Sequence, residues 1–266
     1  MDKDGGVDTL VLVACFLLGL AAGSFGNVVI ARVPAGASVV RPRSACPGCD
    51  APIAAADNVP VLSWLRLRGR CRRCGMSISV AYPLVELVTG LAFVAVGARV
   101  GLDWALPGFL LFAWTLIVVA VIDATTRRIP NRLTYSLTPA LLVLLALAAV
   151  AHGEPLVALR ALAGGVVAFA ALLALALISP RGMGMGDVKL AAFIGVGLGY
   201  LGWSHVLLGV FGAFLLGGAV AIILLAVRLR GRRDLLPFGP YLAVAALLAL
   251  LMGRPLIDAY TGLSGV

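Results

Sequence analysis

Long apolar stretches separated by short charged segments dominate the chain. The stretches that lack a charged side chain are Thr9–Ala31, Trp104–Ile122, Leu133–Gly153, Ala161–Pro180, Leu190–Val227 and Leu235–Gly253. One more, Cys74–Ala98, contains a single acid, Glu86. A helix needs about 20 apolar residues to cross a hydrocarbon core roughly 30 Å thick. Each stretch therefore predicts a membrane-crossing helix.

The stretch Leu190–Val227 is nearly twice as long as one crossing requires. Near its middle stands the sequence Gly-Trp-Ser-His, at positions 202–205. We interpret this stretch as two short helices joined by a tight turn. The pattern as a whole then predicts an all-α polytopic membrane protein with about eight transmembrane helices.

The basic residues give the direction of the crossings, because inner loops of membrane proteins are enriched in Lys and Arg. With eight helices and an outside N-terminus, 17 of the 21 Lys and Arg residues fall on the inner side. The four others are Lys3, Arg99, Arg160 and Arg254. This asymmetry predicts a multi-pass protein of the cytoplasmic (inner) membrane with its N-terminus outside. If Leu190–Val227 crossed once, the arginines at 228–233 would face outward.

Composition agrees with this interpretation. Hydrophobic residues make up 62% of the 266 residues, charged residues 12%, and the mean hydropathy is +1.08. Soluble domains are about a quarter charged, so a soluble globular enzyme, a disordered chain and a fibrous protein are excluded. The net charge of +9 lies in the short loops. It therefore indicates topology and contact with membrane lipids, and we expect no nucleic-acid partner.

The largest polar segment, residues 32–82, carries two Cys-x-x-Cys pairs on the predicted cytoplasmic side. They are Cys46 with Cys49 and Cys71 with Cys74. Two such pairs at this separation are typical of a tetrahedral zinc site with four thiolates. The alternative is a pair of disulfides, which a reducing compartment disfavours. We expect structural Zn²⁺, because four thiolates leave no open position for catalysis and a short loop needs the folding energy of a metal.

Two acids are predicted to lie at the cytoplasmic membrane face. Asp123 ends the third predicted crossing and Asp187 begins the sixth, and the two crossings between them return the chain to the same side. Taken singly, Asp187 is explained as a helix N-cap, and Asp123 as a helix-end acid paired with Arg127 or Arg128. Taken together, paired carboxylates are a hydrolytic device, since one keeps its proton while the other is ionised.

Other hydrolytic chemistries lack their residues. The chain has two histidines, His152 and His205, both expected in turns on the outer side. No His-Glu-x-x-His sequence occurs, which excludes that class of zinc metalloprotease. A serine or cysteine nucleophile on the inner side has no histidine base there. The two aspartates are therefore the candidate catalytic residues.

The chain resembles the prepilin peptidases, or type IV leader peptidases, over most of its length. The matching segments are Gly23–Pro34, the two cysteine pairs, Pro60–Trp64, Tyr82–Glu86, Asp123 with Ile129–Asn131, Gly184–Leu190 and Pro237–Pro240. The resemblance implies a Gly-x-Gly-Asp aspartic endopeptidase with Asp123 and Asp187 as catalytic residues. One departure is Gly26, where the family usually has a larger apolar residue.

The resemblance also implies the substrates and a second activity. Such enzymes cut the short basic leader from type IV prepilins and type II secretion pseudopilins at the cytoplasmic membrane face. Members with the long cysteine loop tend also to methylate the new N-terminus with S-adenosylmethionine. The residues that bind this methyl donor are unknown from the sequence. Glu86 is the acid to test first, its alternative being an interfacial ion pair with a loop arginine.

We expect three regions along the chain. Residues 1–31 form a first transmembrane helix, residues 32–82 the cysteine loop associated with methyl transfer, and residues 83–266 a seven-helix membrane domain with the catalytic aspartates. Two other functions compete with the prepilin peptidase. A proton-coupled transporter would use Asp123 and Asp187 as proton carriers. A presenilin-type intramembrane protease resembles the chain at Gly184–Asp187 and lacks the cysteine loop.

Overall fold

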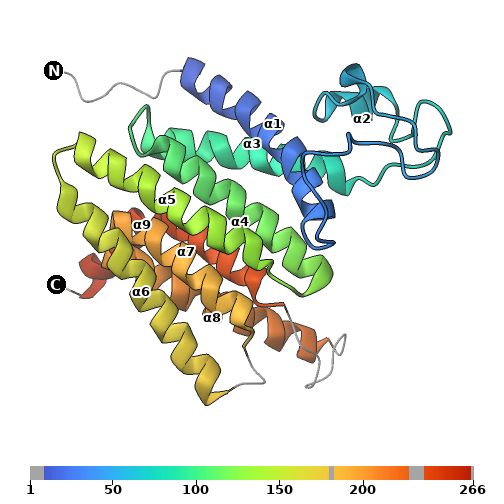
Figure 1. Ribbon diagram of the computed structural model, residues 1–266. Coiled ribbons are helices and arrows are strands. Elements are labelled where there is room, and N and C mark those ends of the chain that lie inside the picture. The colour runs from blue at the N-terminus through green and yellow to red at the C-terminus, as the bar shows by residue number, and fades with distance from the viewer. Residues whose placement is uncertain (1–8, 180–182, 228–236, 265–266) are drawn as a thin grey trace. The chain divides into compact units, whose positions relative to one another are not determined.

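The computed structural model is all-helical and describes residues 9–179, 183–227 and 237–264. Its long helices are α1 (Thr9–Arg32), α3 (Ala81–Val100), α4 (Leu106–Thr126), α5 (Asn131–Ala151), α6 (Pro155–Ile178), α7 (Met185–Leu201), α8 (Trp203–Ala226) and α9 (Gly239–Ser264). The cysteine loop adds a 3-10 turn, η1 (Ala55–Asp57), and a short helix, α2 (Leu62–Arg66). Figure 1 shows these elements in chain order.

Seven of the described helices are long and apolar enough to cross a membrane. The eighth, α7, has 17 residues, which is at the lower limit for a crossing. The predicted division of Leu190–Val227 is confirmed, since α7 ends at Leu201 and α8 begins at Trp203. Gly202 joins them with φ of 145°, a conformation that favours glycine. The arginine cluster at 228–233 lies outside the described residues.

Contacts divide the chain into two compact units, residues 1–102 and residues 103–266. In the N-terminal unit, α1 packs closely on α3. A Cβ atom at Gly19 would lie 2.7 Å from the Cα of Gly90, and one at Gly23 would lie 2.6 Å from the Cα of Glu86. Glycines on α1 therefore let the two helix backbones touch, as small residues do in membrane helix pairs.

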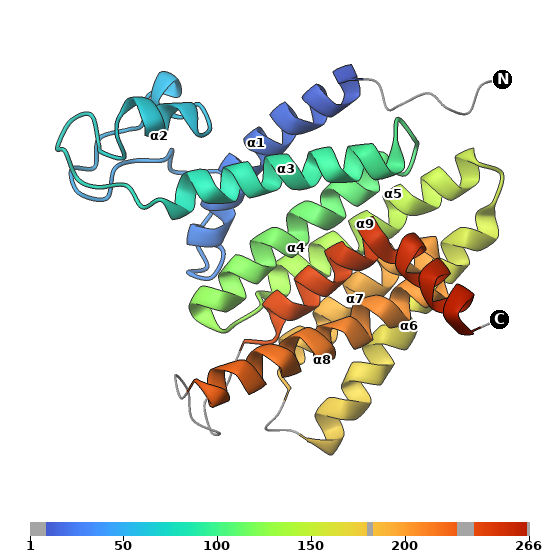
Figure 2. The same ribbon diagram turned by 180° about the vertical axis from the view of Figure 1, so that it is seen from behind.

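In the C-terminal unit, α7 packs against each of the other described helices, α4, α5, α6, α8 and α9. Most of its residues are buried, which explains how a short helix is held at the centre of the unit. In Figure 2, α9 lies between α4 and α8, and it contacts both. The contact of α4 with α7 positions the two helix ends that form the site described below, the C-terminal end of α4 and the N-terminal end of α7.

The crossing of α6 and α7 depends on glycines. A Cβ atom at Gly164 on α6 would lie 2.5 Å from the carbonyl oxygen of Gly195 on α7. One at Gly199 would lie 3.1 Å from the Cα of Ala161. Backbone atoms cannot rotate away from such contacts, so a larger residue must separate the helices.

Gly164→Leu is therefore expected to destabilise the C-terminal unit. Overpacking a tight contact costs about 1–3 kcal/mol, and each kcal/mol lowers the melting temperature of a chain this size by roughly 2–4 °C. Thermal unfolding of the purified protein in detergent measures the change. Gly218→Leu on α8 is the control, because no atom lies within 4 Å of a Cβ there. Equal melting temperatures of the two variants would contradict the packing argument.

Candidate active site

The structure places Asp123 and Asp187 at the same end of the C-terminal unit. Asp123 lies in the last turn of α4, and Asp187 is the third residue of α7. Their side chains are buried, with 6% and 9% of the residue surface exposed. The helices that carry them, α4 and α7, contact one another. Two helices distant in sequence thus bring two acids into one buried site, called the aspartate pair below.

Asp123 is held by a backbone amide. Its Oδ2 accepts a buried hydrogen bond of 3.0 Å from the N–H of Gly239, the first residue of α9. The suggested ion pair with Arg127 or Arg128 is absent from the described residues. Arg127 ends α4 in the left-handed conformation, and both arginines are exposed. The carboxylate instead turns inward to the start of α9.

Asp187 is not the N-cap of α7, which was the simpler explanation of this acid. Gly184 occupies the cap position, and its N–H donates to Asp187 Oδ2 at 3.3 Å. Asp187 Oδ1 is buried and has no hydrogen-bond partner among the described residues. A buried carboxylate oxygen without a partner is costly unless the group is protonated or meets a ligand. Asp187 Oδ1 is therefore the atom of the pair that is open to a proton or a ligand.

The start of α7 is fastened to the start of α5 beside Asp187. Lys189 Nζ donates to Asn131 Oδ1 at 2.8 Å and lies 5.0 Å from the ring centre of Tyr135. A Cβ atom at Gly186 would lie 2.9 Å from the Cβ of Ile129, so the glycine permits this close approach. Lys189 thus bridges two helices rather than simply reaching for solvent. Gly182, the first glycine of the sequence Gly-Met-Gly-Met-Gly at 182–186, lies outside the described residues.

Neither histidine belongs to this site. His152 follows α5 at its far end, and its Nε2 lies 3.0 Å from Asp103 Oδ2. His205 was expected in a turn on the outer side, but it lies in the first turn of the helix α8 and is buried. The reason is that α8 begins immediately after Gly202, so His205 is already part of a packed helix.

Four sulfur atoms gather in the N-terminal unit. The Sγ atoms of Cys46, Cys49, Cys71 and Cys74, called the four-cysteine cluster, lie within 4.8 Å of one another. Cys46 Sγ and Cys74 Sγ are 3.6 Å apart. Tetrahedral thiolates around a zinc ion at 2.3 Å lie about 3.8 Å apart, whereas a disulfide is about 2.05 Å long. This cluster could hold a metal ion.

The two halves of the cluster have the same local backbone. Asp50 follows Cys49 with φ of 51°, and Gly75 follows Cys74 with φ of 74°. The N–H of Asp50 donates to the carbonyl of Cys46, and that of Gly75 to the carbonyl of Cys71. Hydrogen bonds from the backbone N–H groups of Cys74 and Arg73 lower the pKa of the Cys71 thiol to about 6. An easily ionised thiol is a good metal ligand.

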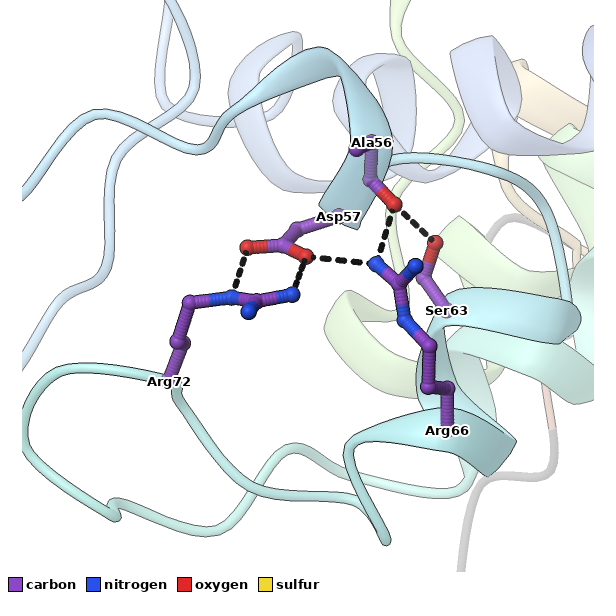
Figure 3. Close-up of polar contacts among 5 residues, drawn as sticks. All are labelled: Ala56, Asp57, Ser63, Arg66 and Arg72. Carbon is purple, nitrogen blue, oxygen red and sulfur yellow. Dashed lines mark hydrogen bonds and ion pairs between the residues drawn. The ribbon is translucent and has the colours of Figure 1, made fainter.

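An acid in the loop gathers two arginines around itself (Figure 3). Arg72, inside the second cysteine pair, makes a two-point contact with Asp57, and Arg66 on α2 lies 2.8 Å from Asp57 Oδ1. Arg66 and Ser63 also donate to the carbonyl of Ala56. The hydrogen bond from Arg72, together with both positive charges, lowers the pKa of Asp57, so the contact stays ionised to a lower pH than an isolated carboxyl group would. These bonds tie the second cysteine pair to η1 and α2.

Glu86 connects the loop to α3, and its partner among the described residues is a backbone amide rather than an arginine. The carboxylate is buried, and its Oε2 accepts the N–H of Val61 at 2.7 Å. Val61 has φ of 61° and ψ of −51°, and the N–H of Leu62 donates to the carbonyl of Pro60 across it. This is a γ-turn of the strained kind, rare for a β-branched residue. Glu86 therefore holds the loop in a conformation that the loop sequence disfavours.

Comparison with known proteins gives two adjoining family matches. Residues 17–100 match the bacterial peptidase A24 N-terminal domain, and residues 110–222 match the type IV leader peptidase family. The chain is 36% identical to the prepilin leader peptidase/N-methyltransferase of Aeromonas hydrophila over 96% of this chain and 95% of the relative. The chain belongs to the type IV leader peptidase family.

Relatives from other bacteria carry the same name. The protein of Bacillus subtilis (strain 168) is 38% identical over 92% of this chain and 96% of its own length. That of Pseudomonas aeruginosa is 33% identical over 96% of both chains. No solved structure gives a significant match. The family resemblance predicted from the motifs is confirmed, and the two family matches fall within the two compact units.

The contact of Gly239 with Asp123 is the feature of this site that sequence reasoning missed. Its signal was the sequence Pro-Phe-Gly-Pro at 237–240, which entered the prediction only as a segment that matches the family. Pro237 precedes α9 and Pro240 is its second residue. The group that contacts Asp123 is the backbone N–H of Gly239, which lies between the two prolines.

Cys71→Ser is expected to abolish metal binding at the four-cysteine cluster. A serine hydroxyl is a far poorer ligand than a thiolate, so the metal content of the purified protein should fall from about one ion per chain to a small fraction. Elemental analysis measures it. Cys15→Ala is the matched control, because Cys15 is buried in α1 and lies outside the cluster. An unchanged metal content in Cys71→Ser would contradict the assignment.

Glu86→Gln is expected to loosen the loop at Val61. The amide oxygen still accepts the N–H, but the charge that strengthens the bond is lost. Hydrogen bonds to charged groups contribute about 1.5–3 kcal/mol and neutral ones roughly 0.5–1.5. Hydrogen exchange of the Val61 amide should therefore become about 10-fold faster. Glu154→Gln, an exposed acid before α6, is the control. Unchanged exchange at Val61 would show that Glu86 does not hold the turn.

Proposed function

We propose that Asp123 and Asp187 are the catalytic residues of a membrane aspartic endopeptidase. The observation that carries the proposal is the convergence of two buried carboxylates, from the contacting helices α4 and α7, at one end of the C-terminal unit. Burying two like charges together costs free energy, so such a pair is expected only where it has a function. Membership of the type IV leader peptidase family supports the same assignment.

Chemically, the aspartate pair shares one proton, because two neighbouring carboxylates do not both ionise. The ionised member removes a proton from a water molecule, whose oxygen attacks the scissile carbonyl carbon. The protonated member gives its proton to the carbonyl oxygen, which forms a neutral tetrahedral intermediate. Collapse of the intermediate breaks the C–N bond, and a proton passes to the departing amine. No metal ion is required for these steps.

We propose that the substrate is the leader of a prepilin or pseudopilin. The names of the relatives support prepilins. The cleavage site then lies at the cytoplasmic face of the inner membrane, with the N-terminus of the enzyme outside. The distribution of basic residues supports this orientation, since 17 of 21 fall on the inner side.

We also propose that the loop at residues 32–82 serves the methylation of the new N-terminus. The four-cysteine cluster would hold structural Zn²⁺, since its sulfur spacing suits a tetrahedral ion. The metal would supply folding energy to a segment with few buried apolar side chains. S-adenosylmethionine supplies the methyl group when bound. Glu86 stays the first acid to test for its binding, with one oxygen already used by Val61.

Asp123→Asn and Asp187→Asn are each expected to lower the rate of leader cleavage by about 10²–10⁴-fold, because each removes an acid–base group. Release of the leader from a purified prepilin, followed by gel mobility or mass, measures the rate. Methylation of a pilin supplied without its leader should be unchanged, since the loop is untouched. Asp50→Asn, an exposed acid of the loop, is the control. Wild-type cleavage by either variant at 123 or 187 would refute the proposal.

A further inference from the structure

The start of α9 presents one amide to the catalytic site. The carbonyl of Phe238 accepts the N–H groups of Tyr241 and Leu242, so Phe238 caps the helix and Gly239 is its first residue. The first amides of a helix have no partner within it. That of Gly239 donates to Asp123 Oδ2 at 3.0 Å, across 116 positions of sequence, and the bond is buried.

Position 239 has no room for a side chain. A Cβ atom there would lie 2.7 Å from Asp123 Oδ2, 3.1 Å from its Cγ and 3.2 Å from its Cβ. The backbone at Gly239 is not among the positive-φ conformations. Glycine is therefore needed at this position for the approach of the carboxylate rather than for the turn.

Neighbouring contacts fix where this amide lies. The ring of Phe238 packs on that of Phe214 from α8, with 4.9 Å between their centres. A Cβ atom at Gly217, also on α8, would be in contact with the Tyr241 ring at 3.4 Å. Residues before and after Gly239 in the sequence, Phe238 and Tyr241, thus pack the first turn of α9 against α8.

The two aspartates differ in their surroundings. Asp123 accepts a buried bond of 3.0 Å at the positive end of α9. Asp187 lies at the positive end of α7, but its one described bond is longer, 3.3 Å, and its Oδ1 has no described partner. Hydrogen bonds to a carboxylate favour its ionised form, and a buried oxygen without a partner disfavours it.

We infer that Gly239 is a positioning residue for the peptidase reaction, whose N–H holds Asp123 as the ionised base and leaves Asp187 as the protonated acid. This inference rests on the proposed catalytic role of the aspartate pair. The sequence assigns the roles of base and acid to the pair as a whole, and this inference assigns one role to each residue. With Asp123 Oδ2 engaged by Gly239, Oδ1 receives the proton of the attacking water. Asp187 gives its proton to the carbonyl oxygen of the substrate.

Gly239→Ala tests the positioning role. A methyl group at this position displaces Asp123, so kcat for leader cleavage should fall about 10–100-fold, as misplacement of a catalytic group does. The KM for the prepilin should change less than twofold, because substrate contacts are untouched. The control is Gly218→Ala on α8, where the space is open. An unchanged kcat, or a higher KM with unchanged kcat, overturns the positioning role.

Asn variants test the division of roles without changing residue 239. Asparagine resembles a protonated carboxyl group, because its amide still donates a hydrogen bond. Asp187→Asn can therefore keep part of the polarisation of the carbonyl, whereas Asp123→Asn has no base. We expect the residual kcat of Asp187→Asn to exceed that of Asp123→Asn by about 10-fold or more.

The outcomes of this comparison are distinguishable from failure of the proposed function. Equal residual rates, or the reverse order, overturn the division of roles and leave the aspartate pair as catalytic residues. Cleavage at the wild-type rate by either variant overturns the catalytic role itself and the inference with it. Both rates are measured on full-length enzyme in detergent with the same purified prepilin, alongside its thermal unfolding.

Discussion

Two acids are buried together at one end of the C-terminal unit, and the helices around them must hold each carboxylate against a hydrogen-bond donor. Asp123 and Asp187 come from helices separated in sequence by α5 and α6. Each has one backbone amide as its described hydrogen-bond donor, from Gly239 and Gly184. A buried polar atom without a partner costs about 1–3 kcal/mol. The starts of α7 and α9 must therefore lie within hydrogen-bond distance of the two carboxylates. The glycines and prolines around these helix starts permit that placement.

Close packing through glycine provides the positions. The helix α7 is short, yet it packs against all other described helices of its unit because Gly164, Gly195 and Gly199 bring its backbone against α6. Lys189 and Gly186 fasten its first turn to the segment that begins α5. In a membrane the hydrophobic effect does not hold helices together, so such contacts and hydrogen bonds carry the packing. The fold is thus built around the helix that carries one of the two acids.

Much of this arrangement is predictable from the sequence, because the length of each apolar stretch and the basic residues beside it can be read from one short segment at a time. The crossings, the break at Gly202 and the cluster of four cysteines all follow from composition and spacing. The partners of the acids do not. Glu86 bonds to the amide of Val61 and Asp123 to that of Gly239, whereas ion pairs with arginine were the simpler expectation. A backbone amide is present at almost every residue, so the sequence does not mark the one that will bind an acid. Gly239 is also 116 positions from Asp123, too far for a local sequence pattern to indicate the contact.

On the proposed mechanism, Asp123 and Asp187 act on one water molecule and one peptide bond as a single unit. Leader cleavage by Asp123→Asn, Asp187→Asn and the double variant tests this joint action. Residues that act as a unit give non-additive losses. We predict that the double variant cleaves no more slowly than Asp123→Asn alone. A double variant whose loss equals the product of the two single losses would show that the acids act independently, and would contradict the account.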